Sequence, residues 1–204
     1  EPVKFNRSEP LDPKRFQYLE GCVREEAEFE MPTFKAHNDA PLLYVSFGSL
    51  GSGDTKLLKR LMDAVSTMPV RALFNVGDYL DAYASVPDNV HIASWYPQPS
   101  VIARADAVIH HGGNNSFNEC LYFGKPALIM PYVWDGHDNA TRVQETGHGY
   151  HLHRNNWSNQ ELQETINKML TSQEMHARLA KTSAHMRSQH GPTKAAAILS
   201  ELLN

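Results

Sequence analysis

The sequence lacks long hydrophobic runs and a surplus of basic residues. Its 204 residues include 19 lysines and arginines against 23 aspartates and glutamates, a formal net charge of −4, whereas a nucleic-acid-binding protein would usually show a basic face. No apolar run approaches the roughly 18–20 residues of a membrane-spanning helix. With 41% hydrophobic and 21% charged residues, the composition is that of a globular chain and excludes one that is disordered throughout.

Cysteine is scarce, and no targeting segment is visible. Cys22 and Cys120 lie far apart, and we expect two independent reduced thiols, as in a cytosolic protein. The chain begins Glu1-Pro2-Val3, without the basic and apolar regions of a secretory signal, although an upstream segment could have been removed. Four Asn-x-Ser/Thr triplets begin at Asn6, Asn114, Asn139 and Asn156. Such triplets arise often by chance, so we expect no glycosylation and a cytoplasmic location.

The first 40 residues differ from the rest. Residues 1–41 hold five of the 12 prolines, residues 24–30 are dense in charge, and hydrophobic periodicity is weak. This pattern predicts that residues 1–40 are a linker or the tail of a preceding N-terminal domain, not part of a core. Residues 41–204 are then one folded domain.

From residue 41 onward, β-rich apolar runs alternate with stretches of helical periodicity. Strands are predicted at residues 42–47, 71–76, 90–93, 107–110, 127–130 and 149–153. Helices are predicted after Asp54, at 100–104, 116–123 and 139–146, after the capping box at Ser158, and over 173–203 with a break at Gly191-Pro192. The alternation predicts an α/β fold, a Rossmann-like parallel sheet with helices on both faces. Ligands of such sheets bind beyond the carboxyl ends of the strands.

Two turns at this edge of the sheet are candidates for phosphate binding. The glycine-rich turn at residues 48–53 has neither the G-x-G-x-x-G nor the P-loop spacing, and by itself it is more typical of a flexible connection. In residues 111–116, a histidine and two glycines lead into a helix that opens at Asn114, Asn115 and Ser116. A helix N-terminus attracts anions, but a tight turn with ordinary caps explains the same residues equally well.

The combined spacing of several motifs resembles the donor-binding signature of the UDP-glycosyltransferases. The matching segments are Trp95-Tyr96-Pro97-Gln98, residues 111–119 from His111 to Glu119, Gly124-Lys125-Pro126, Pro131, Asp135 and Asn139, together with Phe47-Gly48-Ser49 after the first strand. The resemblance covers residues 41 to the C-terminus. It implies the donor-binding, C-terminal half of a two-domain GT-B glycosyltransferase.

The resemblance also implies a nucleotide-sugar site. Its residues would be Ser49, Trp95, Gln98, His111, Gly113, Asn115, Ser116, Glu119 and Asp135. Trp95 would stack on the uracil ring, with Gln98 against the base and ribose, and Glu119 would accept hydrogen bonds from both ribose hydroxyls.

The remaining residues of the implied nucleotide-sugar site would bind the diphosphate and the sugar. His111 would donate a hydrogen bond to the β-phosphate, with Asn115 and Ser116 on the α-phosphate side. Ser49 would face the diphosphate from the opposite turn, and Gly113 would let the backbone approach it. Asp135 would bind hydroxyls of the transferred sugar.

Two residues depart from the family pattern, and three residues next to Asp135 could have either a binding or a structural role. Gly136 stands where the family usually has glutamine, so the resemblance does not imply that glucose is the donor sugar. Asn114 replaces the tryptophan of plant members. His137 and Asp138 are candidates for donor selectivity. We expect Trp134 to pack rather than to contact sugar.

Three further histidines and one tryptophan are expected to have structural roles and no part in binding or catalysis. We expect His148, His151 and His153 to be surface residues, with the latter two on one strand face, and no metal site. Trp157, just before the capping box, is expected to be a staple or core residue.

The function implied is inverting, metal-independent glycosyl transfer from a UDP-sugar, or a dTDP-sugar, to an acceptor hydroxyl. His111 and Ser49 would stabilise the leaving diphosphate, no cofactor is needed, and no D-x-D pair is present. No residue matches the family's catalytic base, because that base and the small-molecule acceptor pocket belong to the N-terminal domain. Three alternatives stay open: a nucleotide-sugar epimerase, a non-catalytic nucleotide-sugar-binding module acting with a partner chain, and a lipid-acceptor transferase.

Overall fold

Six parallel strands form a single sheet in the order β3-β2-β1-β4-β5-β6. The structure is a computed structural model that describes residues 12, 16–24 and 26–203. The strands are β1 (Leu42–Ser46), β2 (Arg71–Asn75), β3 (Val90–Ala93), β4 (Ala107–His110), β5 (Ala127–Ile129) and β6 (Gly149–His151). All six predicted strands are present, four of them ending one or two residues early. The expected α/β fold with a Rossmann-like parallel sheet is confirmed.

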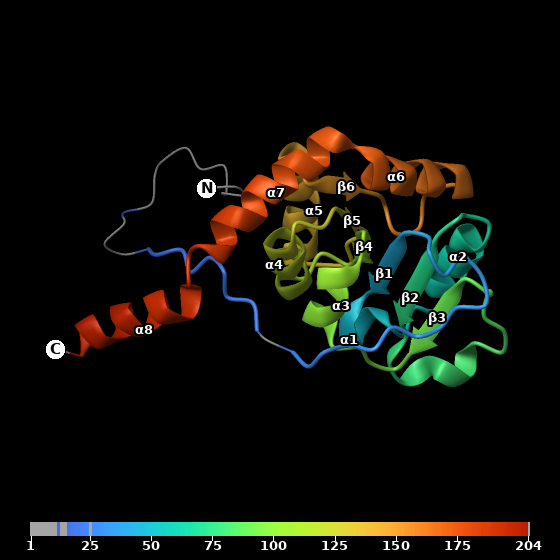
Figure 1. Cartoon of the computed structure of the whole chain (residues 1–204), viewed down its shortest axis with the longest axis horizontal. Coiled ribbons are helices and arrows are strands. Elements are labelled where there is room, and N and C mark those ends of the chain that lie inside the picture. Colours follow the sequence, from blue (N-terminus) through green and yellow to red (C-terminus); the bar gives the residue numbers. More distant parts are fainter. Residues whose placement is uncertain (1–11, 13–15, 25, 204) are drawn as a thin grey trace.

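Helices cover both faces of this sheet (Figure 1). They are α1 (Gly48–Gly51), α2 (Thr55–Ser66), α3 (Gln98–Arg104), α4 (Asn114–Phe123), α5 (Asp135–Glu145), α6 (Asn159–Thr171), α7 (Gln173–Arg187) and α8 (Gly191–Leu202), with a 3-10 helix η1 at Gly77–Ala82. Helices α2 and α6 pack on one face, and α3, α4, α5 and α7 pack on the other. Strand residues alternate between the two cores, Leu43 and Val45 facing the first and Leu42 and Tyr44 the second.

The helix starts follow from local capping. Asp54 Oδ1 accepts a hydrogen bond from the amide of Leu57 at 3.1 Å, which begins α2. Ser158 Oγ accepts from the amide of Glu161 at 3.1 Å, which begins α6 as the capping box predicts. Trp157 is buried beside this cap, with the Arg60 guanidinium stacked 3.6 Å from its ring centroid. Its expected role in the core is therefore confirmed.

The segment that precedes the sheet contributes to the core. Its described residues, 16–24 and 26–40, contain no helix or strand, as the weak periodicity predicts. Phe34, however, is only 4% exposed and belongs to the core beneath α3 and α4. Ser100 and Arg104 of α3 donate to the carbonyls of Ala27 and Phe29. The segment is thus anchored to the domain by one buried aromatic ring and by hydrogen bonds from α3.

The chain turns sharply at its C-terminal end. The predicted break at Gly191-Pro192 separates α7 from α8, and α8 extends away from the sheet (Figure 1). No side chain fits at Gly191, because a Cβ there would lie 2.4 Å from the Cys22 sulfur. Cys22 and Cys120 are both free, as expected. Among the described residues, no helix combines the length and hydrophobicity of a membrane span.

Candidate functional site

The site lies where the strand order reverses between β1 and β4. The chain leaves β1 towards β2 and leaves β4 towards β5, so the connections after these adjacent strands diverge and open a crevice. A pocket of about 370 Å³ occupies this place. It is lined by Phe47, Gly48, Ser49, Gln98, His111, Gly113, Asn114, Asn115 and Ser116. Six of the nine predicted site residues therefore line one pocket.

The β1 side of the pocket is a short helix rather than a flexible connection. Gly48 has a φ of +67°, a conformation that favours glycine, and begins the four-residue helix α1. A Cβ at Gly48 would lie 3.0 Å from the His111 ring, and Ser49 is exposed at the pocket. The glycine thus brings the backbone of one turn against the histidine of the other.

The β4 side is the N-terminus of α4. Its N-cap is Gly113, which has no side chain to cap the helix, and the first turn contains no acidic residue. No hydrogen bond within the described part of the chain occupies the amide N–H groups of Asn115 and Ser116. These N–H groups and the helix dipole make this end of α4 suited to an anion.

The His111 ring lies between the two turns. A Cβ at Gly113 would be 2.6 Å from His111 Nε2, so both Gly48 and Gly113 leave space for the imidazole. Burial lowers the pKa of His111, and Asp135 and the main-chain carbonyl of Ser46 only partly oppose this. At neutral pH the ring is therefore neutral and has one N–H to donate.

His110, which the sequence reasoning left in the strand, supports the same turn. It is fully buried, and its Nδ1 accepts a hydrogen bond from the amide of Gly112 at 3.0 Å. Burial lowers the pKa of His110 to about 3, so it is neutral. This bond helps to hold Gly112 at its φ of +91°. The only sequence signal for this role is that a polar residue ends an otherwise apolar strand.

Gln98 connects α3 to Ser116 and Glu119 of α4. Its Nε2 donates to Ser116 Oγ at 3.1 Å and to Glu119 Oε2 at 2.6 Å. Glu119 is only 5% exposed, and burial raises the pKa of its carboxyl, while the bond from Gln98 lowers it. A buried carboxylate held in this way is a strong hydrogen-bond acceptor beside the pocket.

A layer behind the pocket joins α4 to α5. Asp135 Oδ2 accepts a hydrogen bond from the Asn114 amide at 3.3 Å. Asn139 Nδ2 donates to the Gly112 carbonyl at 2.7 Å and to Asn114 Oδ1 at 2.9 Å. Sequence reasoning noted Asn139 only as part of the signature, whereas the structure makes it a positioning residue for the β4–α4 turn.

Close packing explains why residue 136 is a glycine. A Cβ at this position would lie 2.7 Å from the His111 carbonyl oxygen, so the backbone of α5 rests directly on the turn that carries His111. The Cα–Cβ direction at residue 136 therefore points at main chain rather than into the pocket.

The two exposed tryptophans lie outside the pocket lining. Trp95 follows β3 and is 62% exposed, three residues before Gln98. Trp134 is 78% exposed and has a φ of +51°, so the expectation that it packs is wrong. An indole this exposed has a face free to stack on a planar or apolar partner.

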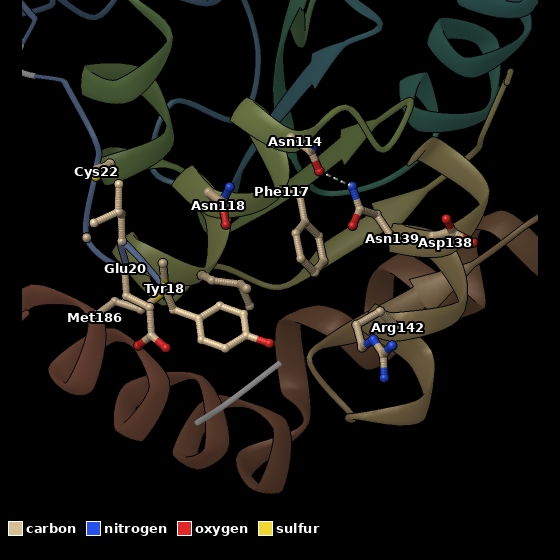
Figure 2. Close-up of a pocket in the computed structure, with 13 residues that line it drawn as sticks. Tyr18, Glu20, Cys22, Asn114, Phe117, Asn118, Asp138, Asn139, Arg142 and Met186 are labelled. Carbon is tan, nitrogen blue, oxygen red and sulfur yellow. Dashed lines mark hydrogen bonds between the residues drawn. The ribbon is translucent and has the colours of Figure 1, made fainter. Parts of the chain in front are cut away.

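A second cavity, of about 260 Å³, lies between the N-terminal segment and helices α4, α5 and α7 (Figure 2). Figure 2 shows Tyr18 extending from the N-terminal segment below Phe117, and Asn114 bonded to Asn139 at the upper edge. Sequence reasoning missed this cavity because residues 1–40 were assigned to a linker. Across the residues that the structure describes, no group of three or more histidine, cysteine, aspartate or glutamate side chains is arranged so that it could hold a metal ion.

Comparisons with known proteins agree on one family. Residues 59–202 match the family described as erythromycin biosynthesis protein CIII-like, C-terminal domain. The chain is 28% identical over 198 residues to the NDP-glycosyltransferase YjiC of Bacillus subtilis, covering 96% of this chain and 50% of that protein. It is also 28% identical over 203 residues to the aclacinomycin-T 2-deoxy-L-fucose transferase of Streptomyces galilaeus, covering 98% and 46%.

A solved structure shares the fold of this chain. The crystal structure of the glycotransferase of kitacinnamycin superposes with a TM-score of 0.85 at 22% identity, over 95% of this chain and 51% of that one. The chain thus spans about half the length of the relatives it matches. It belongs to the erythromycin biosynthesis protein CIII-like C-terminal domain family, and its fold is that of the C-terminal half of a GT-B glycosyltransferase.

Proposed function

We propose that this domain binds the nucleoside diphosphate sugar from which a glycosyl group is transferred. The observation that carries the proposal is the pocket between β1 and β4, where the N-terminus of α4, His111 and Ser49 surround one space. All three present hydrogen-bond donors, and no carboxylate lines this pocket among the residues described. A diphosphate is the part of a nucleotide sugar that matches such donors.

The same donors would assist the departure of the leaving group. As the glycosidic bond breaks, negative charge grows on the diphosphate, and preorganised donors stabilise that charge more in the transition state than in the ground state. This negative charge would be stabilised by the amides at the helix start (Asn115 and Ser116), by the His111 N–H and by the Ser49 hydroxyl. With this stabilisation supplied by the protein, transfer would need no divalent metal ion. That transfer inverts the sugar's configuration is proposed from the resemblance to the UDP-glycosyltransferases alone.

The remaining residues would bind the nucleoside and sugar. We assign Trp95 to stacking on the base, Gln98 to the base and ribose, Glu119 to the ribose hydroxyls and Asp135 to sugar hydroxyls. Gln98 and Glu119 already lie in one hydrogen-bonded group beside the pocket, which supports their joint assignment. UDP is the first choice of nucleotide. The alternative is dTDP, with which one similar structure, that of the glycosyltransferase VinC, is in complex.

The acceptor would be a small molecule bound by a second, N-terminal half. The relatives are about twice as long as the matched region, which supports this division of labour. The base that deprotonates the acceptor hydroxyl would then also come from that half. A hexosyl transferase is the proposed activity of the whole protein.

The donor site is tested by calorimetric titration of this chain with UDP, UDP-glucose, dTDP and GDP in the presence of EDTA. We expect saturable binding of UDP or dTDP without a metal. Trp95→Ala should weaken it by about 1–3 kcal/mol, the contribution of a base stacked on an aromatic ring. Trp134→Ala, which removes an even more exposed indole, is the control and should leave UDP binding unchanged. Failure of every nucleotide to bind would contradict the proposal.

The diphosphate assignment is tested with His111→Ala. Loss of one hydrogen bond to a charged group should weaken UDP by about 1.5–3 kcal/mol and leave uridine, which has no phosphate, unaffected. In a transferase containing this domain, kcat should fall by roughly a hundred- to a thousandfold, as when one donor to a developing oxyanion is removed. Turnover that survives the substitution unchanged would disprove the leaving-group role.

A further inference from the structure

A third cavity opens at the carboxyl ends of β5 and β6, beside the donor pocket along the same edge of the sheet. It has a volume of about 200 Å³. Its lining residues are Pro131, Tyr132, His137, His151, His153, Arg154 and Asn155. Three imidazoles and one guanidinium thus surround a small space, and the lining includes no carboxylate among the residues described. The donor site assigned above uses none of these side chains, although the sequence made His137 a candidate for donor selectivity.

The guanidinium of Arg154 is held in place but weakly neutralised. Its carbon lies 3.9 Å from the Tyr132 ring centroid, and its Nε lies 3.9 Å from Asp54 Oδ2, too far for a hydrogen bond. Both Asp54 oxygens are already engaged, Oδ1 by the Leu57 amide and Oδ2 by the Tyr132 hydroxyl at 3.1 Å. A positive charge stacked on a ring and poorly paired can bind another anion.

The imidazoles are close enough to influence one another. Burial lowers the pKa of His151, and the nearby His137 and His153 lower it further. His153 Nδ1 accepts a hydrogen bond from the Asn155 amide at 3.2 Å, so in the neutral ring the proton is on Nε2. That N–H remains as a donor. These rings come from different elements, His137 from α5, His151 from the end of β6 and His153 from the loop after it.

The carboxylates of Asp135, Asp138 and Asp54 face other groups, although Asp54 also forms a long ion pair with Arg154. On α5, Asp135 contacts the Asn114 amide, and Asp138 lines the cavity of Figure 2. Asp54, at the start of α2, is committed to its cap and to Tyr132. The cavity is therefore a group of donors whose positive charge can increase on protonation.

We propose that this cavity binds an oxyanion, a carboxylate or a phosphate, through Arg154 and the imidazoles of His137, His151 and His153. That a substrate carries the anion, either on the donor sugar or on the acceptor, rests on the proposed function. Oxyanion binding itself does not. An anion placed among these rings would favour their protonated forms, so binding takes up protons and is tighter at lower pH.

Sulfate is the probe, because its charge does not change between pH 6 and pH 8. In NMR titrations of the whole chain at constant ionic strength, the Cε1–H signals of His137, His151 and His153 should shift and saturate together at pH 6. At pH 8 the affinity should be lower, by about tenfold for each imidazole whose pKa the anion raises by one unit. Shifts that never saturate, or that chloride reproduces, overturn the proposal.

Matched variants locate the site. The double variant His151→Gln/His153→Gln removes two exposed donors and should abolish saturable sulfate binding. His176→Gln, on α7 and outside the cavity lining, should leave it unchanged. Binding that survives the double variant, or that is equally lost in His176→Gln, places the anion elsewhere and overturns the assignment.

A second pair of titrations identifies the source of the anion. If it is on the donor sugar, UDP-glucuronate should bind more tightly than UDP-glucose, and the double variant should remove that advantage. If it is on the acceptor, the two donors should bind equally and sulfate should still bind when UDP-glucose is present. Sulfate binding without any nucleotide binding would refute the proposed function and support the oxyanion site. Loss of both would refute both.

Discussion

Replacing Glu119 with glutamine is expected to weaken UDP binding by about ten- to a hundredfold. The buried carboxylate can accept hydrogen bonds from both ribose hydroxyls, and a hydrogen bond to a charged group contributes about 1.5–3 kcal/mol. Glutamine keeps the size of the side chain and loses the charge. Calorimetric titration with UDP and dTDP measures the effect, which should be larger for UDP because the deoxyribose of dTDP lacks one hydroxyl.

The stability of the same variant should change in the opposite direction. Burial raises the pKa of Glu119 in the folded chain, so its charged form disfavours folding at neutral pH. This penalty disappears as the pH falls through the folded-state value towards that of an ordinary glutamate. Glu119→Gln should therefore melt no lower than the unsubstituted chain at pH 7. A fall in both Tm and affinity would instead indicate a structural role and count against the ribose assignment.

The pH dependence of the affinity for UDP-glucose gives an independent check on Glu119, because the terminal phosphate of free UDP would itself take up a proton at about pH 6. Protonation of the carboxyl removes its charge, so affinity should decline as the pH falls, beginning above the pH at which an ordinary glutamate titrates. The Glu119→Gln variant should not show this decline. Titrations of both chains between pH 4 and pH 7 make the comparison. Parallel curves would mean that another group controls the effect.

Adding a single methyl group at Gly136 is expected to disturb the site more than its size suggests. The Cβ of Gly136→Ala would lie 2.7 Å from the His111 carbonyl oxygen and 3.4 Å from Pro131 Cβ. Because the first contact is with main chain, the start of α5 or the β4–α4 turn must move. Overpacking of this kind costs about 1–3 kcal/mol of folding stability. UDP affinity should also fall, since the same turn positions the imidazole of His111.

Gly53→Ala is the matched control for this substitution. A Cβ at Gly53 would meet the Tyr79 hydroxyl at 3.0 Å, but Tyr79 is an exposed side chain that can move away. Its Tm and UDP affinity should stay close to those of the unsubstituted chain. If Gly136→Ala behaves in the same way, α5 does not constrain the His111 turn. By the same geometry, the glutamine usual in UDP-glycosyltransferases should impair this site when placed at residue 136.

Most of the architecture could be predicted from local patterns. The strand at 107–110 and the caps at Asp54 and Ser158 are confirmed, because apolar periodicity and side-chain-to-amide bonds act over a few residues. The resemblance to the UDP-glycosyltransferase signature likewise predicted six positions that line the pocket between β1 and β4. These signals are short-range, so no knowledge of the folded chain is needed to recognise them.

Interactions between distant segments were decided by the tertiary structure. The glycine-rich turn forms α1 instead of a flexible connection, and a Cβ at its Gly48 would lie 3.0 Å from the ring of a histidine 63 positions along the chain. Trp134 is exposed, although its hydrophobicity favours burial, and His148, which was expected at the surface, is only 2% exposed. Phe34 enters the core from a segment without periodicity. Each outcome depends on which surfaces meet, and the local sequence does not encode that.

The sequence by itself therefore determined the order and class of the elements and the residue types at the edge of the sheet. Only the tertiary structure decided how those residues combine. It placed His111 between two glycines, joined Gln98 to Glu119, and gathered His137, His151 and His153 around Arg154. The physical reason is range: hydrophobic periodicity and capping act within one element, whereas a binding site requires close approach of several elements, which packing of the two cores imposes.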